Sequence, residues 1–154
     1  MDITHILDGD CTRADLVAPS RKRAIEAAAE LLAKADVALS SRAIFDELMA
    51  RERLGSTGLG EGVAIPHCRM PCHRVRGAFL HLRDAVDYDA IDNQAVDLLF
   101  VLMVPPEENT AHLEVLASLA RIFGDPTNRD ALRSCTTDAE LFQRIAGLYS
   151  SLAA

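Results

Sequence analysis

Features that would place a chain in a membrane, in the secretory pathway or on nucleic acid are absent from this sequence. No apolar run approaches the ~20 residues of a membrane-spanning helix, and the first residues lack the basic and apolar segments of a signal peptide. The net charge of −7 disfavours general binding to nucleic acids or anionic membranes. Four cysteines without a secretory signal are more typical of reduced thiols than of a disulfide framework. We therefore expect a cytoplasmic protein with no membrane insertion and no nucleic-acid partner.

The sequence also lacks the motifs of the common nucleotide-binding and hydrolytic sites. The glycine-rich residues 55–62 read Gly-Ser-Thr-Gly-Leu-Gly-Glu-Gly, without the Lys-Ser/Thr that ends a P-loop. They precede an apolar strand pattern, whereas the loop of a dinucleotide fold follows a strand and opens a helix. No Gly-x-Ser-x-Gly nucleophile elbow occurs. On the residues alone, a wide turn from helix to strand is the more frequent explanation of these glycines, and we predict no cofactor.

The length of 154 residues indicates a single domain, residues 1–154. Consecutive strand patterns in the middle of the chain predict a mixed sheet, and helical patterns on both sides of them predict an α/β fold with helices on both sheet faces. The expected strands are 14–19, 63–65, 77–82 and 98–104, with 67–73 irregular and 83–95 a connection. The first two expected helices are about 21–35, after Ser20, and one from Ser40 or Ser41 to near Gly55. The last three are one from Asn109 or Thr110 to Gly124, one over about 127–134, and one that begins at Thr137.

Two of these elements carry specific expectations about burial. The unbroken apolar run at 98–104, closed by two prolines, fits a central strand covered on both faces. In the helix before Gly124, four apolar residues at helical spacing should share the packed face: Leu113, Leu116, Ala120 and Phe123.

Residues 51–67 are the stretch around which a site can be built. The apolar residues 63–65 predict a short buried strand, and Pro66 fixes the backbone at its end. The next side chain is His67, whose imidazole can act as a nucleophile, a base or a metal ligand. His112 falls in the first turn of a predicted helix, where the helix dipole favours a neutral imidazole and attracts anions. Arg51 could stabilise oxyanions if the loop folds back, although a solvated helix end would explain it equally well.

A metal site is the alternative chemistry for this region. His67, Cys68, Cys72 and His73 form a His-Cys-x3-Cys-His cluster that a small zinc protein could use. Zinc sites usually pair two short ligand clusters across a longer segment, and no second pair is present in the sequence. Adjacent residues also point apart, so we predict no metal.

Residues 51–67 (Arg-Glu-Arg-Leu-Gly-Ser-Thr-Gly-Leu-Gly-Glu-Gly-Val-Ala-Ile-Pro-His) resemble the phosphorylation-site signature of enzyme IIA proteins of the fructose/mannitol class. These belong to the bacterial phosphoenolpyruvate-dependent phosphotransferase system. Residues 90–94 (Ala-Ile-Asp-Asn-Gln), 96–105 and 111–113 (Ala-His-Leu) resemble the nitrogen-type branch in particular. The resemblance extends over nearly the whole chain and implies the family fold, a mixed sheet between helices.

The resemblance implies a phosphocarrier. A phosphorylated histidine phosphocarrier protein would pass its phosphoryl group to Nε2 of His67. By motif position, Arg51 matches the arginine that stabilises the phosphoryl oxygens, and His112 matches the second active-site histidine. Glu61 would oppose the phosphate charge if it pointed inward, so we expect it to face solvent. Cys68 departs from the signature, which most often has glycine there, and a thiol could slow transfer or add redox sensitivity.

Three functions remain open at this stage. The first is a nitrogen-type enzyme IIA that acts in regulation, because the chain has no membrane segment and no second domain with a phosphorylatable cysteine. The second is a sugar-transport enzyme IIA that passes phosphate to a separate IIB domain. The third is a binding module whose phosphorylation state regulates partners such as transporters or sensor kinases.

Overall fold

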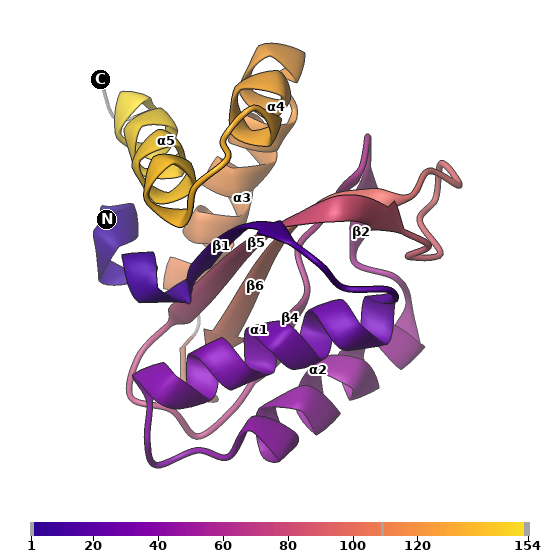
Figure 1. Ribbon diagram of the computed structural model, residues 1–154. Coiled ribbons are helices and arrows are strands. Elements are labelled where there is room, and N and C mark those ends of the chain that lie inside the picture. The colour runs from indigo at the N-terminus through magenta and orange to yellow at the C-terminus, as the bar shows by residue number, and fades with distance from the viewer. Residues whose placement is uncertain (1, 109, 153–154) are drawn as a thin grey trace.

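A computed structural model describes residues 2–108 and 110–152, and a six-stranded mixed sheet runs through the centre of this part of the chain (Figure 1). The strand order is β1-β5-β6-β3-β2, and β4 also pairs with β6. β6 is antiparallel to β5 and parallel to β3 and β4, which confirms the predicted mixed sheet. The strands are β1 (Thr12–Leu16), β2 (Gly58–Gly60), β3 (Val63–Ala64), β4 (His67–Arg69), β5 (Arg76–Val86) and β6 (Val96–Val104).

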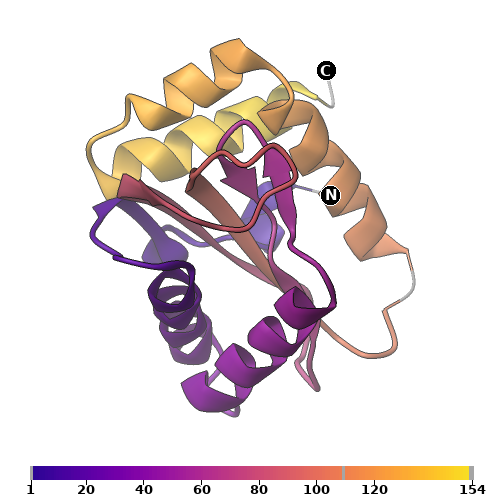
Figure 2. The same ribbon diagram turned by 90° about the vertical axis from the view of Figure 1, so that its right-hand side faces the viewer.

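Helices cover both faces of the sheet, as predicted (Figures 1 and 2). Two helices lie on one face, α1 (Arg21–Ala35) and α2 (Ser41–Leu54); three lie on the other, α3 (Ala111–Phe123), α4 (Pro126–Arg133) and α5 (Asp138–Ser151). Two 3-10 turns, Ile3–His5 and Gly9–Cys11, precede β1. Among the described residues, no helix is long and apolar enough to cross a membrane.

Serine and threonine caps begin three of the helices where the sequence predicts them. The hydroxyl of Ser20 accepts a hydrogen bond from the backbone N–H of Arg23 at 3.2 Å, and Ser40 rather than Ser41 caps α2. Thr137 accepts the N–H of Glu140 at 3.1 Å, one of the two hydrogen bonds of the capping box expected for the last helix. Such caps replace hydrogen bonds that the first turn of a helix cannot make internally. The local sequence therefore predicted the first residues of these three helices correctly.

The strands differ from prediction where pairing is non-local. β1 begins two residues earlier than expected, at Thr12, and ends at Leu16 before the exposed Val17. β5 continues to Val86, so part of the expected connection 83–95 is strand. Residues 67–69, expected to be irregular, form β4, whose His67 pairs with Leu102 of β6. Parallel pairing with a distant strand leaves no signal in a three-residue segment, which explains the error. The central strand β6 is buried along nearly its whole length, as expected.

The prediction for the packed face of α3 was correct for Phe123 and partly correct for Leu116, which packs against the core, but it was wrong for Leu113 and Ala120. Leu113 is 55% exposed and Ala120 is exposed, whereas the residues buried against the sheet are Val115, Leu119, Ile122 and Phe123. The helix is apolar around most of its circumference, so periodicity alone could not select the inner face. Thr110 occupies the N-cap position without a side-chain cap, and Oε1 of Glu108 accepts the N–H of Ala111 instead, at 3.0 Å. Asn109, the other predicted cap, lies outside the described residues.

The turn between β2 and β3 depends on Gly62, which has φ +80°. A Cβ there would lie 2.5 Å from Nη2 of Arg133 and 3.2 Å from Oδ1 of Asp97. We expect Gly62→Ala to lower the free energy of unfolding by about 1–3 kcal/mol, measured in urea. The control is Gly147→Ala in α5, where a Cβ meets nothing within 4 Å; it should raise that free energy by about 0.5–1 kcal/mol. A Gly62→Ala variant as stable as the wild type would contradict the strain argument.

Candidate functional site

His67 is the first residue of β4. Backbone hydrogen bonds fix both the residue before it and its own side chain. Pro66 before it is buried, and the carbonyl of Pro66 accepts the N–H of Leu102 at 2.9 Å. Nδ1 of His67 lies 2.9 Å from the carbonyl oxygen of Ile65. A carbonyl oxygen can only accept, so Nδ1 carries the proton in this hydrogen bond. In the neutral ring the lone pair is then on Nε2, which is the nitrogen available as a nucleophile.

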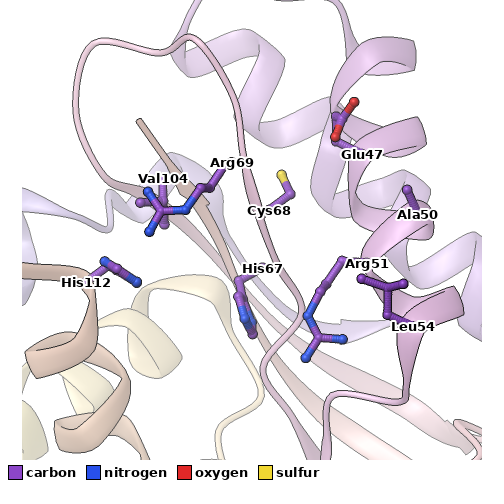
Figure 3. Close-up of a pocket in the computed structure, with 9 residues that line it drawn as sticks. All are labelled: Glu47, Ala50, Arg51, Leu54, His67, Cys68, Arg69, Val104 and His112. Atoms are coloured by element: carbon purple, nitrogen blue, oxygen red, sulfur yellow. The ribbon is translucent and has the colours of Figure 1, made fainter. Parts of the chain in front are cut away.

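Arg51 lies in the last turn of α2 and points toward the same space as His67 (Figure 3). Its Nη1 donates to the carbonyl oxygen of Gly55 at 2.9 Å, which holds the guanidinium over the loop rather than in open solvent. The side chain is part-buried. Because guanidinium is always charged and presents several donors in one plane, this placement suits an anion beside His67.

His112 lies in the first turn of α3 and faces the site from the other side of His67 (Figure 3). Burial lowers the pKa of this imidazole below its ordinary value of 6.5, and the nearby charge of Arg69 lowers it further. His112 is therefore neutral at pH 7. Its Nδ1 is buried and has no hydrogen-bond partner among the described residues. A water molecule or a polar group of a ligand would satisfy it.

The three residues predicted from the sequence meet at one hollow. Arg51, His67 and His112 line a cavity of about 560 Å³ that opens between α2, β4 and the start of α3 (Figure 3). A second hollow of about 410 Å³ lies between the glycine-rich segment and α3, and Arg51 and His67 line this one as well. The two side chains thus stand on the ridge between the hollows. The outer face of α3, with Leu116, forms part of the second wall.

Arg69 belongs to the same hollow and was not singled out by the sequence. Its Nη1 donates to three carbonyl oxygens of the loop before α3: Pro105 at 3.1 Å, Pro106 at 3.2 Å and Glu108 at 2.8 Å. The arginine therefore joins the strand that carries His67 to the loop that leads to His112. Its position two residues after the histidine, on the same face of an extended strand, was the available signal.

Replacing Arg69 should change the ionisation of His112. A positive neighbour disfavours the imidazolium, so Arg69→Gln is expected to raise the pKa of His112 toward its ordinary value, while burial continues to lower it. An NMR titration of the histidine ring protons measures both values. Arg74→Gln, which removes an exposed cation from the following loop, is the control and should leave this pKa unchanged. An identical His112 pKa in wild type and Arg69→Gln would contradict the proposed electrostatic contact.

Cys68 is turned away from the nucleophile. Figure 3 shows its sulfur directed toward α2 and Glu47, while the ring of His67 lies on the side of the Arg51 guanidinium. Burial raises the pKa of the Cys68 thiol to about 12, so the thiol is protonated at neutral pH. Since the thiolate is the reactive form, this argues against the redox sensitivity considered for Cys68. Within residues 2–108 and 110–152, no three His, Cys, Asp or Glu side chains are placed to hold one metal ion, so the structure does not assemble the zinc cluster.

The glycine-rich segment forms a short hairpin, β2 and β3, rather than a phosphate loop. A Cβ on Gly58 would lie 2.9 Å from the Cβ of Ala90. Gly58 therefore allows the backbone to pack closely against another segment of this chain. The N–H of Glu61 donates to Oδ2 of Asp92 at 2.8 Å, and this bond lowers the pKa of Asp92. The side chain of Glu61 is 64% exposed, which confirms that it faces solvent.

Comparison with known proteins identifies the family of this chain. The family model described as "Phosphoenolpyruvate-dependent sugar phosphotransferase system, EIIA 2" matches residues 5–147. The "Nitrogen regulatory protein" of Klebsiella oxytoca is 40% identical over 147 residues, which cover 94% of this chain and 90% of that protein. The crystal structure of "Nitrogen Regulatory Protein IIA-Ntr" from Neisseria meningitidis superposes with a TM-score of 0.86 at 38% identity, over 96% of this chain and 98% of that chain.

A sugar-specific relative matches less closely. The 2-O-alpha-mannosyl-D-glycerate-specific EIIABC component of Escherichia coli (strain K12) is 31% identical over 148 residues, which cover 94% of this chain but only 22% of that protein. The similarity thus extends over nearly the whole length of the nitrogen regulatory proteins, and the predicted resemblance to the nitrogen-type branch is confirmed. The chain belongs to the EIIA 2 family of the phosphoenolpyruvate-dependent sugar phosphotransferase system.

Proposed function

We propose that this chain carries a phosphoryl group on Nε2 of His67 in a regulatory phosphotransferase system. The observation that supports this best is the hydrogen bond from Nδ1 to the carbonyl of Ile65. It leaves the lone pair on Nε2, in a hollow that a permanently charged arginine also lines. A phosphocarrier needs this combination of a neutral nucleophile and a fixed cation for the incoming oxygens.

The transfer is an in-line displacement between two imidazoles. The Nε2 lone pair of His67 forms a bond to phosphorus while the bond from phosphorus to the donor's histidine nitrogen breaks and returns its electron pair to the donor. The loose transition state places charge on the three equatorial oxygens. Arg51 would bind these oxygens, and neutral His112 would donate a hydrogen bond to one of them or position it. Positioning and charge stabilisation by these residues would account for the rate.

The surface around the hollow suits docking of a protein donor. Leu54, Leu59 and Leu113 are 85%, 53% and 55% exposed, and they belong to α2, β2 and α3, the elements that surround His67. Exposed apolar side chains gathered around a charged centre are typical of protein interfaces. We infer that the donor is a histidine phosphocarrier protein. The regulated partners, such as transporters or sensor kinases, would read the charge added at this surface, and the chain would act in the cytoplasm.

Regulation is favoured over sugar uptake by the pattern of similarity. Full-length similarity joins this chain to nitrogen regulatory proteins, whereas in the sugar-specific component the matching segment is about a fifth of a longer protein. A chase of the phosphorylated protein with sugar-specific IIB domains distinguishes the two roles. We expect the phosphoryl group to remain on the chain, and rapid transfer to a IIB domain would instead support sugar transport.

Incubation with phosphoenolpyruvate, enzyme I and the cognate phosphocarrier protein tests the proposed function directly. Intact-protein mass spectrometry should show one added phosphoryl group that is lost in acid, because phosphoramidates are acid-labile. Omission of the phosphocarrier protein should prevent the modification. A wild-type protein that stays unmodified with its native donor would overturn the proposal.

A further inference from the structure

A buried carboxylate lies directly behind the candidate site. The side chain of Glu52, in the last turn of α2, is only 1% exposed. Its oxygens accept hydrogen bonds from the N–H of Thr57 at 3.2 Å, from the Thr57 hydroxyl and from the Tyr88 hydroxyl at 3.0 Å. Arg21 is the nearest cation, at 3.9 Å from Oε2. A carboxylate so fully removed from water needs several such partners to offset the loss of its hydration.

One branch of hydrogen bonds leads from this carboxylate to the ring of His67. Thr57, whose N–H is bound by Glu52, uses its carbonyl oxygen to accept the N–H of Ile65 at 3.1 Å. The carbonyl of Ile65 in turn accepts Nδ1–H of His67 at 2.9 Å. The N–H and the C=O of one residue belong to different peptide units. The carboxylate therefore affects His67 by fixing the position of the backbone between them, and not by polarising a single amide group. The carboxylate holds Thr57, Thr57 holds Ile65, and Ile65 selects the tautomer.

A second branch leads from the same residue to Arg51. The backbone carbonyl of Glu52 accepts the N–H of Gly55 at 3.1 Å, and the carbonyl of Gly55 accepts Nη1 of Arg51 at 2.9 Å. This branch uses only the backbone of Glu52, so it does not depend on the carboxylate. The first branch alone connects the side chain of Glu52 to a group expected to act on the phosphoryl group. Each branch ends on a carbonyl oxygen whose direction decides where the functional side chain points.

Stability alone is a poor reason for this arrangement. Replacing a buried charge network by apolar side chains of similar volume is often neutral or stabilising, so such a network is weak evidence of a role in stability. Tyr88 completes the network as a donor, because burial and the charge of Glu52 raise the pKa of its hydroxyl and keep it protonated. Its backbone carbonyl accepts the Ser56 hydroxyl at 2.9 Å, which ties the glycine-rich segment to the same network.

We propose that Glu52 is a positioning residue whose carboxylate keeps His67 in its Nδ1–H tautomer. The effect on phosphoryl transfer rests on the proposed function, but the effect on the tautomer does not. This separation allows the two ideas to fail independently.

The test is the tautomer of His67 in Glu52→Gln, read from the nitrogen chemical shifts of the unphosphorylated protein. Glutamine keeps the size of the side chain but replaces one of the two accepting oxygens by an NH2 donor. It therefore cannot accept at both positions that bind the Thr57 N–H and the two hydroxyls. We expect wild-type His67 to be mainly Nδ1–H and the variant to contain several-fold more of the Nε2–H form. Phosphoryl transfer should slow by about 10- to 100-fold, in kcat with little change in KM for the donor, because the docking surface is unchanged.

Asp97→Asn is the matched control. Asp97 is another carboxylate with little exposure, part-buried where Glu52 is buried, and it is paired with Arg133 at 3.0 Å. No hydrogen bond among the described residues joins its side chain to His67 or Arg51. We expect this variant to lose stability but to keep the wild-type tautomer ratio and transfer rate. Equal changes in both variants would mean that general loosening of the fold, and not Glu52, is responsible.

A folded Glu52→Gln protein with the wild-type tautomer ratio would overturn the proposal. If that variant does not fold, Glu52→Asp decides, because a side chain shorter by one methylene withdraws the carboxylate from the N–H of Thr57 and still offers a buried acceptor. An unchanged tautomer ratio in Glu52→Asp would contradict the proposal equally. If the wild type accepts no phosphoryl group but Glu52→Gln still shifts the tautomer, the proposed function fails and the positioning role stands.

Discussion

Replacing His67 with alanine is expected to abolish phosphoryl uptake completely. Nε2 of this ring is the atom that we propose forms the bond to phosphorus, and water or a methyl group in its place cannot form the phosphoramidate. The other imidazole at the hollow, His112, has its ring on the opposite side and lies in a different element. The measurement is intact-protein mass spectrometry after incubation with phosphoenolpyruvate, enzyme I and the phosphocarrier protein.

Two further variants sharpen the result for His67. His67→Asn can keep a donor toward the carbonyl of Ile65 but has no second ring nitrogen, so it should also accept no phosphoryl group while retaining the fold. His73→Ala removes an exposed imidazole from the next loop and should be phosphorylated like the wild type. Wild-type levels of acid-labile phosphate on His67→Ala would place the acceptor on another residue and contradict the assignment.

Replacing Arg51 with alanine is expected to slow phosphoryl transfer by about 10²–10³-fold, the usual cost of removing one preorganised group that stabilises transition-state charge. The loss should appear in kcat, since the charge on the equatorial oxygens is greatest in the transition state. Arg51→Lys should recover only part of the rate, because an ammonium cannot bind two oxygens in the plane of a guanidinium. Rapid-quench measurement of phosphohistidine formation provides the rates.

Arg53→Ala is the control for Arg51. The residue lies two positions along the same helix, is exposed, and does not line the hollow, so the variant makes the same change in net charge away from the site. We expect a transfer rate within a factor of about two of the wild type, since exposed charges are well screened at physiological salt. An Arg51→Ala variant as fast as the wild type would exclude this arginine from the mechanism.

Local patterns in the sequence were sufficient for the helices and for the centre of the sheet. Ser20, Ser40 and Thr137 each begin a helix because a side-chain oxygen reaches an N–H three residues away. The apolar run that became β6 is long enough that burial on both faces is its only favourable state in water. These interactions act over a few residues, so they leave readable patterns.

The sequence by itself determined the candidate residues of the site and their chemistry. Residues 51–67 indicated a firmly held imidazole after a short strand, and the family resemblance supplied the expected roles of Arg51, His67 and His112. Neither could determine that the three side chains share one hollow, because His112 comes 45 residues after His67 in the chain (112 minus 67). Their meeting depends on β4 pairing with β6 and on α3 returning over the sheet edge, which are contacts between distant segments.

Only the tertiary structure decided which nitrogen of His67 is free, what surrounds the site and what stands behind it. The tautomer follows from the carbonyl of Ile65. Arg69 binds the loop before α3, which is distant in the sequence. Glu52 binds Thr57, in the segment that folds back on the end of α2. The outward face of α3 likewise followed from packing, since its apolar residues left both orientations open. The physical reason is common to all of these: hydrogen-bond direction and burial are properties of groups brought together by folding, and periodicity along a chain does not contain them.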